Sequence, residues 1–358
     1  MLNRTWKLGK SKALVLGKED RLIVGMDVHK KTIHVALRRN GQEERTWVMP
    51  MSVEKVVAGL EPMRPALKKV VYEAGPTGYG LARALKQAGL PVEVIAPGKT
   101  PQPANPGSKT DRLDCRKLAE YAEKGLLKPV AIPTEQEEAD RQVVRLRDQL
   151  GVKQRRAKQQ IKSLLLQQGI AEPEGLAHWS AAGMAALKTL SLTHQIRLAL
   201  DVLVEELEHL MASRQRVERQ MAWLSKQKRH RENHRIVRTH PGVGPVTAMT
   251  FLTEVYQPHR FTCAEELTSY VGLAPRVRQS GQMRREGPLI KAGRGALRSL
   301  LIEASWQWIR RDAQAQAVYR RLVGNTGSGQ KAIVAMARRL AVHLWCMLCR
   351  GENYRAAA

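Results

Sequence analysis

The sequence predicts a mixed α/β domain over residues 21–130, a long helical region over 131–235 and a mostly helical domain over 236–358. In the first region, short apolar runs alternate with Gly, Pro and Asn turn signals. In the second, strand signals disappear and apolar residues recur every three or four positions. The third is compact and basic. Residues 1–20 fit none of these patterns, and we treat them as an N-terminal extension.

The first region contains the elements of one sheet. Residues 22–29 form an apolar strand that ends on charged residues, and 32–39 alternate like a second strand. Asn40-Gly41 is a strong hairpin signal before a third strand at 45–49. The remaining expected elements are a helix at 52–67, a strand at 69–73, a helix at 79–88, a strand at 92–95, a loop at 97–108 and a helix from about Thr110. This is the order of a ribonuclease-H-like fold, with an open doubly wound sheet as the alternative.

The middle region predicts two long helices separated by residues 172–175. The apolar positions of the second helix step by three and four, and they are Ile196, Leu200, Leu203, Leu207, Leu210, Val217, Met221 and Leu224. Arg214 interrupts this seam, and a polar seam residue of this kind fixes register. The first helix carries Val143, Leu146, Leu150 and Ala157 in similar phase. An intramolecular hairpin and an intermolecular coiled coil explain this pattern equally well.

The composition points to a polyanionic partner. The 358 residues include 60 Lys and Arg against 33 Asp and Glu, which gives a formal net charge of +27. A hydrophobic content of 43% excludes a disordered basic tail. No uninterrupted apolar run reaches the roughly 18 residues of a membrane span, so we expect no membrane partner. Four cysteines and no signal peptide predict a reducing, cytoplasmic location.

Four carboxylates are candidate metal ligands. Asp27 interrupts an apolar strand, where an uncompensated charge is costly. Glu73 ends another apolar strand, and Asp111 and Asp114 share one face at the start of a helix. In a ribonuclease-H-like fold these acids converge, and they would need one or two Mg²⁺ ions, or Mn²⁺ in their place. Taken singly, Asp111 fits a helix cap, Asp114 a solvated helix face and Glu73 a strand end.

The third region carries two candidate nucleic-acid contacts. Gly242-Val243-Gly244 precedes a helix and resembles a phosphate-binding hairpin, although a plain helix–turn–helix connection fits equally well. Residues 276–298 contain one acid, Glu286, and seven cations, which are Arg276, Arg278, Arg284, Arg285, Lys291, Arg294 and Arg298.

Ser280 is a candidate nucleophile. It lies in a polar stretch at 278–282 that we expect to be a loop flanked by cations. Cations beside a serine neutralise a phosphodiester and stabilise the charge that develops during attack. The simpler interpretation is that Ser280 only occupies a turn.

Other reactive side chains favour structural roles. Cys346 and Cys349 have the spacing of half a zinc site, but they lie in an apolar helical stretch without a second pair, so we expect buried thiols. We expect His29 at the surface after the first strand, with a contact to the metal site or substrate as the alternative. We expect Trp306 and Trp308 to be core or partner-facing residues, with base stacking as the alternative.

These acids and motifs together resemble a known family. The acids are followed in order by Pro-Gly-Val-Gly (241–244), Gly-Leu-Ala-Pro (272–275), Ser280-Gly281 and Gly-Arg-Gly-Ala-Leu-Arg (293–298). The set, which spans about 21–350, resembles the DEDD-type insertion-sequence transposases related to the Piv DNA invertase. Some members of that group are guided by a bridge RNA.

The resemblance implies a RuvC-like domain with Asp27, Glu73, Asp111 and Asp114 as Mg²⁺ ligands, and a transposase domain with Ser280 as nucleophile. It implies a covalent phosphoserine intermediate with target and donor DNA. It also implies a structured non-coding RNA partner and a dimer or tetramer in which protomers share a site. Ile290 and Arg294 depart from the family pattern, which commonly has a polar residue and an Asn at these positions.

Two other functions remain open on the sequence alone. A RuvC-like nuclease or resolvase would use the same acids with water as the attacking group, and Ser280 would then be incidental. A non-catalytic nucleic-acid-binding protein would use only the basic C-terminal domain, and it would leave Asp27 unexplained.

Overall fold

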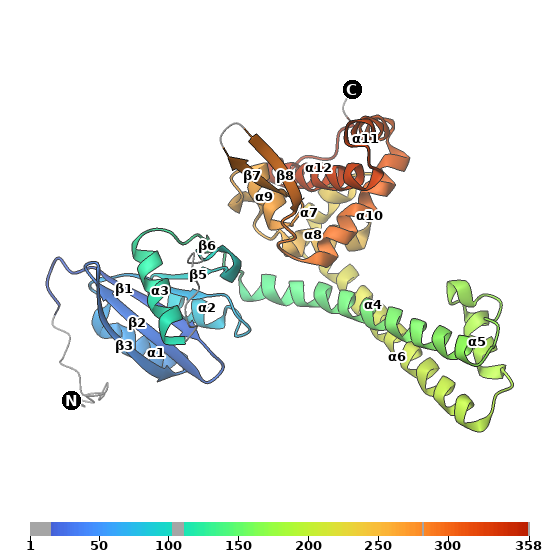
Figure 1. Cartoon of the computed structure of the whole chain (residues 1–358), viewed down its shortest axis with the longest axis horizontal. Helices are drawn as coiled ribbons and strands as arrows, with labels where there is room; N and C mark the ends of the chain where they lie inside the picture. Colours follow the sequence, from blue (N-terminus) through green and yellow to red (C-terminus); the bar gives the residue numbers. More distant parts are fainter. Residues whose placement is uncertain (1–15, 102–110, 281–282, 357–358) are drawn as a thin grey trace. The chain divides into compact units, whose positions relative to one another are not determined.

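The structure is a computed structural model that describes residues 16–101, 111–280 and 283–356, without the side chains of 99, 111–113, 277–280 and 283–286. The chain divides into two compact units, residues 1–134 and 135–358 (Figure 1). The first unit contains the large sheet, and the second contains the long helices and the basic C-terminal region.

A six-stranded mixed sheet forms the first unit, in the order β3-β2-β1-β4-β5-β6. Its strands are β1 (Leu22–Val28), β2 (Thr32–Arg39), β3 (Gln42–Pro50), β4 (Leu67–Glu73), β5 (Val92–Ile95) and β6 (Pro129–Val130). β1 pairs with β2 antiparallel and with β4 parallel. This is the strand order predicted for a ribonuclease-H-like domain, and the mixed α/β prediction is confirmed. The sequence did not predict β6, which is only two residues long.

The predicted turn at Asn40-Gly41 joins β2 and β3. Both residues have positive φ, 51° and 89°, as the hairpin turn that suits the strand twist requires. Asp20, in the predicted N-terminal extension, braces this turn: it accepts a hydrogen bond from Asn40 at 2.9 Å and pairs with Arg39 at 2.6 Å. A residue just ahead of β1 therefore holds the turn of the hairpin in place.

Helices cover both faces of the sheet. α1 (Val53–Leu60) and α2 (Gly80–Gln87) pack on the face that carries Val24, Met26 and Tyr72. α3 (Asp111–Glu123) covers the other face. The predicted helix at 52–67 was too long: α1 ends at Leu60, where a short 3-10 helix (Glu61–Met63) with a proline in its first turn follows.

A long helical hairpin begins the second unit. α4 (Glu135–Gln167) packs against α6 (His194–Ser225), with α5 (Ala181–Thr189) between them in the chain (Figure 1). The intramolecular alternative therefore holds within this chain. Leu200, Leu207 and Leu210 are buried as predicted. Leu146 was predicted on the seam but is 44% exposed, and Val144 is buried in its place because the helix face turns toward the C-terminal core.

The predicted interruption at Arg214 forms a polar layer inside the hairpin. Arg214 donates to Gln154 Oε1 at 3.0 Å and to Glu218 Oε1 at 2.9 Å. Gln154, which is 6% exposed, donates in turn to the Leu210 carbonyl at 3.0 Å. Because these bonds form at one alignment of the two helices, they favour that register.

Six helices and a β-ribbon form the rest of the second unit as it is described. The helices are α7 (Lys228–Arg238), α8 (Pro245–Glu254), α9 (Ala264–Tyr270), α10 (Gly295–Arg311), α11 (Ala313–Thr326) and α12 (Gly329–Arg350). The ribbon pairs β7 (Pro275–Ser280) with β8 (Met283–Leu289). It corrects the prediction of a polar loop at 278–282 for residues 278–280, which end β7, whereas 281 and 282 lie outside the described residues. The sequence around it is polar on successive positions, so it lacks the apolar alternation that marks a half-buried strand.

Within the described ranges, α12 is the one helix long and apolar enough to cross a membrane by length and composition. Half of its most apolar stretch is buried, and residues such as Leu340 and Leu344 lie at the centre of the C-terminal core. Core packing accounts for the apolar composition of this helix.

Candidate active site

Asp27 and Glu73 lie at the carboxyl ends of two neighbouring parallel strands, Asp27 one residue before the end of β1. Met26 of β1 pairs with Tyr72 of β4, and each acid is the next residue along its strand. Met26 and Tyr72 belong to the core beneath α1 and α2, so the alternation of a strand directs Asp27 and Glu73 to the opposite face, under α3. The sheet therefore brings these two acids together at one edge.

α3 lies directly on this face because β1 has a glycine at the crossing point. A Cβ at Gly25 would lie 2.6 Å from the Ala119 nitrogen and closer still to the Cys115 carbonyl oxygen. Farther along, Leu118 of α3 packs near Ile23 of β1. The helix consequently runs opposite to β1, and its first turns lie toward the Asp27 end of the strand.

Asp111 and Asp114 are in those first turns. Asp114 immediately precedes Cys115 and is half-buried. Burial, followed by the nearby Asp27 carboxylate, raises the pKa of the Cys115 thiol to about 11. The Asp27 carboxylate is therefore near enough to the first turns of α3 to act on Cys115. Asp111 is the first residue of the helix, but its side chain lies outside the described residues.

The described side chains do not complete a metal centre. No three of the described Asp, Glu, His and Cys side chains are close enough together to hold an ion. Asp111 is outside that comparison. The donors that the fold gathers at this edge are carboxylate oxygens, which are the ligands that Mg²⁺ and Mn²⁺ accept. The chemistry of the donor set fits a hard divalent cation.

Two further side chains contact these acids, and a third lies opposite Asp27 on the neighbouring strand. Thr100 Oγ1 donates to Glu73 Oε1 at 2.6 Å. His29 Nε2 lies 3.1 Å from Asp27 Oδ2, although the histidine is 45% exposed as its predicted surface position suggests. His34 is opposite Asp27 in the β1–β2 register, and its ring packs edge-on against that of His29. Because the connection between β1 and β2 is short, the sequence is enough to place His34 opposite Asp27. The sequence has no comparable signal that places Thr100 beside Glu73.

The predicted nucleophile is in the β-ribbon. Ser280 ends β7 and pairs with Met283, and Arg278 pairs with Arg285. The side chains of Ser280, Arg278, Arg284 and Arg285 lie outside the described residues.

The other predicted cations divide into two groups. Arg276 and Lys291 are exposed. Arg294 instead lies 3.3 Å from Asp148 and 3.6 Å from Glu254. Arg298 donates to the Ala292 carbonyl at 2.6 Å, so it braces the segment before α10.

The Gly-Val-Gly turn connects α7 and α8. A Cβ at Gly242 would lie 2.9 Å from Trp308 Cβ and closer to the Ala304 carbonyl, so this glycine lets the turn sit against α10. Gly244 is the N-cap of α8 and faces open space. The phosphate-binding interpretation therefore applies to Gly244 and the start of α8, whereas Gly242 serves packing.

The cysteine and tryptophan predictions have mixed outcomes. Cys346 and Cys349 are free and only partly buried, and they have no metal-binding partners among the described side chains. Trp308 is 5% exposed in the core, but Trp306 is 38% exposed.

Comparisons with known proteins agree with these features. Residues 24–169 match a family model described as "Transposase", and residues 234–320 match the model for the transposase IS116/IS110/IS902 family. A putative transposase, y4qE, of Sinorhizobium fredii is 31% identical over 297 residues, which are 80% of this chain and 71% of that protein. The transposase for insertion sequence element IS1533 of Leptospira borgpetersenii is 28% identical over 352 residues, 90% of this chain and 94% of the relative.

Among solved structures, Thermus thermophilus RuvC in complex with a Holliday junction substrate aligns with 31% of this chain and 99% of its own, at 16% identity and a TM-score of 0.23. The sequence relatives and both family models agree with each other, and the acids in the first model's range lie on the strands and helix described above. The chain belongs to the IS116/IS110/IS902 family of transposases.

Proposed function

We propose that this transposase exchanges DNA strands through a covalent phosphoserine intermediate formed by Ser280, with Asp27, Glu73, Asp111 and Asp114 as the ligands of Mg²⁺ or Mn²⁺. The observation that carries the proposal is the convergence of Asp27, Glu73 and the start of α3 at one edge of the sheet. A buried strand has no structural use for two acids at this position, because apolar residues would stabilise it better.

In the proposed reaction one phosphoester bond forms for each one that breaks, in both cleavage and religation. The Ser280 hydroxyl oxygen attacks a DNA phosphorus atom and loses its proton, and the bond from phosphorus to one sugar oxygen breaks. That sugar oxygen leaves as a hydroxyl by taking a proton. Attack by the sugar hydroxyl of another strand reverses the step, so religation needs no external energy source. A bound divalent ion supplies charge stabilisation for the phosphate oxygens.

The β7–β8 ribbon and its flanks are the proposed DNA-binding element. A two-stranded ribbon fits the major groove of B-DNA. The cations proposed to contact DNA are Arg276, Arg278, Arg284, Arg285 and Lys291, together with the α8 N-terminus at Gly244. Arg298 supports the adjacent backbone, and Arg294 pairs with the carboxylates of Asp148 and Glu254.

We assign oligomerisation to the helical hairpin. Of the ten large hydrophobic side chains that are exposed among the described residues, seven are on α4 or α6: Leu146, Val152, Leu166, Leu198, Val202, Met211 and Trp223. Apolar side chains gathered on one element mark an interaction surface. A dimer or tetramer that buries them agrees with the intermolecular interpretation of the sequence pattern, and mass photometry of Leu198→Glu and Val202→Glu proteins tests it.

A structured non-coding RNA is the proposed guide. The resemblance to guided transposases and the net charge of +27 support this partner. Purification of the protein from its native locus, followed by sequencing of the bound RNA, tests the assignment. Recovery of random cellular RNA alone would contradict it.

Trapping the covalent intermediate tests the central mechanism. The substrate is the element's own end with its native flank, nicked so that a short fragment diffuses away after cleavage and religation cannot occur. We expect a protein–DNA adduct that mass spectrometry locates at Ser280. Ser280→Ala should abolish the adduct, whereas Ser163→Ala, a change at an exposed serine of α4, should not.

The acids are tested in the same assay. Asp27→Asn should lower adduct formation by at least about 100-fold while DNA binding persists. Glu61→Gln changes an exposed carboxylate of the same unit that pairs with Arg64, and it should have no effect. Cleavage without any adduct would instead establish the water-using nuclease.

A further inference from the structure

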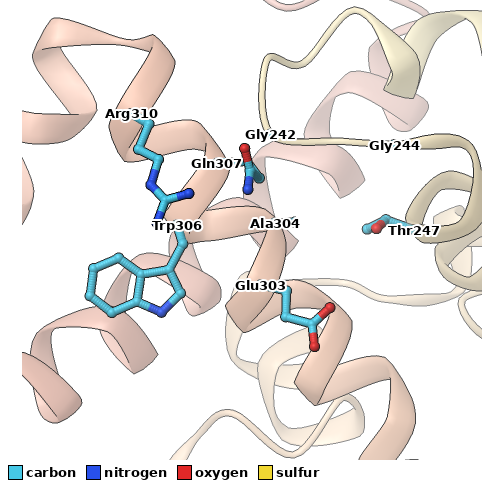
Figure 2. A pocket seen from close by; sticks show the side chains of 8 residues that line it. All are labelled: Gly242, Gly244, Thr247, Glu303, Ala304, Trp306, Gln307 and Arg310. Carbon is cyan, nitrogen blue, oxygen red and sulfur yellow. The ribbon is translucent and has the colours of Figure 1, made fainter. Parts of the chain in front are cut away.

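A cavity of about 600 Å³ lies in the second unit between α8 and α10. Gly242, Gly244 and Thr247 line one side, and Glu303, Trp306 and Arg310 line the other (Figure 2). The α10 residues recur at three- and four-residue intervals, so they form one continuous face of the helix. The volume lies within the range of sites that hold small organic ligands.

The wall on the α8 side contains hydrogen-bond donors without protein partners. Thr247 is 8% exposed, and its hydroxyl has no hydrogen-bond partner within the described part of the chain. Figure 2 shows its side chain directed across the cavity toward α10. The hydroxyl oxygen itself is accessible although the residue is largely buried, so it is open to a ligand in the cavity. No side chain caps α8, so the first N–H groups after Pro245 have no side-chain acceptor, and Gly244 just before them lines the cavity.

The α10 side of the cavity presents a cation, an aromatic ring and a carboxylate. Arg310 is exposed and forms no ion pair in the described structure, so it is available to an anion. Trp306 presents an aromatic surface that is 38% exposed and is held edge-on by Tyr319 of α11, with ring centroids 5.4 Å apart. Glu303 adds an exposed carboxylate, which accepts hydrogen bonds.

The side chains that line this cavity suit a nucleotide better than a simple anion. A bare phosphate would gain from Arg310 and the α8 N-terminus, but Glu303 and Trp306 would contribute nothing to its binding. A nucleotide would contact all of these groups. Its phosphate would pair with Arg310 and accept hydrogen bonds from the N–H groups of α8. Its base would stack on the Trp306 indole, and the amino groups of the base would donate to the Glu303 carboxylate. A base inside a duplex cannot reach such a cavity, whereas an unpaired base can.

We propose that this cavity binds one unpaired nucleotide of a DNA or RNA strand. The phosphate lies at the α8 N-terminus between Thr247 and Arg310, and the base packs on Trp306 with its polar edge toward Glu303. The inference rests on the proposed function for the kind of ligand, a nucleic acid, but it requires no chemistry at Ser280.

Direct binding of defined probes tests the cavity. Full-length Ser280→Ala protein is titrated against fluorescent DNA hairpins that are either fully paired or contain one bulged nucleotide, and against RNA hairpins of the same design. We expect the bulged probes to bind more tightly than the paired ones. Preference for bulged DNA, bulged RNA or both supports the proposal and identifies the source of the nucleotide.

Substitutions in the cavity should remove this preference alone. Trp306→Ala should weaken binding of the bulged probe by about 5- to 150-fold, the range for loss of one stacked base, and change binding of the paired probe by less than about twofold. Arg310→Gln and Thr247→Val should also weaken binding of the bulged probe. Thr247→Ser keeps the hydroxyl, so this protein should bind the bulged probe as the protein with Thr247 does. Arg320→Gln, which changes an exposed arginine of α11 away from the cavity, should have no effect.

Two results would overturn the inference. One is an equal loss of bulged and paired binding in the cavity variants, and the other is an unchanged bulge preference in folded Trp306→Ala protein. Because the protein lacks the proposed nucleophile, failure here leaves the adduct experiment unaffected. Failure of the adduct experiment likewise leaves the binding result intact.

Discussion

Gly25→Ala should separate the start of α3 from the strand-end acids. The added Cβ would lie 2.6 Å from the Ala119 nitrogen, and the Cys115 carbonyl would be even nearer, so no side-chain rotation relieves the clash. A normal contact needs a separation of about 3.5 Å, which requires α3 to move outward by about 1 Å. Overpacking of this kind costs about 1–3 kcal/mol of folding free energy. A 1 Å displacement of catalytic groups lowers activity by about 100-fold.

Three measurements check this prediction. Adduct formation should decrease by about two orders of magnitude, the melting temperature should fall by a few degrees, and Cys115 should become reactive toward thiol reagents as α3 lifts. Gly80→Ala is the matched control, because its Cβ would meet no atom within 4 Å. Wild-type adduct yield and a protected Cys115 in a folded Gly25→Ala protein would refute the proposed geometry.

Three more predictions concern stability. Burial lowers the pKa of His240 from 6.5 to about 3. Between these values the unfolded chain binds a proton that the folded chain does not, so stability should decrease as pH falls, by about 2 kcal/mol at pH 5. Arg145→Ala should cost about 3 kcal/mol because it leaves Glu254, 4% exposed, without its bidentate partner. Gln154→Ala should cost about 1–2 kcal/mol because it removes the acceptor of Arg214 Nη1 and the side-chain donor to the Leu210 carbonyl.

Urea unfolding measures all three effects. His240→Gln protein should lose much of the difference in stability between pH 5 and pH 7, and an unchanged difference would contradict the assignment to His240. The Arg145→Ala/Glu254→Ala protein should be more stable than the sum of the single effects predicts, whereas strict additivity would show that the pair does not interact. For Gln154→Ala, hydrogen exchange should increase in α4 and α6 first, and faster exchange confined to other helices would contradict the prediction.

Most elements of the first unit could be predicted from short stretches of sequence. Apolar runs, the Asn40-Gly41 turn and the strand-ending acids predicted the sheet order, because each signal depends on neighbouring residues. The end of α1 was missed because the proline that stops it lies inside an otherwise helical pattern. The two-residue β6 is too short to carry any periodicity.

The β-ribbon and the surroundings of the acids were harder to predict. β7 and β8 are polar, so neither shows the alternation that identifies strands with a buried face. The contact between Thr100 and Glu73 joins residues that are distant in sequence and meet only because β4 and β5 are neighbours. Arg294 resembled a DNA contact because it lies in a basic segment, but its carboxylate partners, Asp148 and Glu254, are on α4 and α8.

α4 and α6 each contribute to two separate hydrophobic cores. Val144 and Met221 lie in the C-terminal core, and Ile161 and Leu200 lie in the core near α5. Because α4 and α6 are anchored in both cores, the two helices form a stiff element about 50 Å long, the length of a 33-residue helix. Arg145 on α4 donates to Glu254 on α8, the helix whose other end borders the cavity. The proposed assembly surface and the proposed nucleotide site would therefore lie on helices that are joined by a partly buried ion pair.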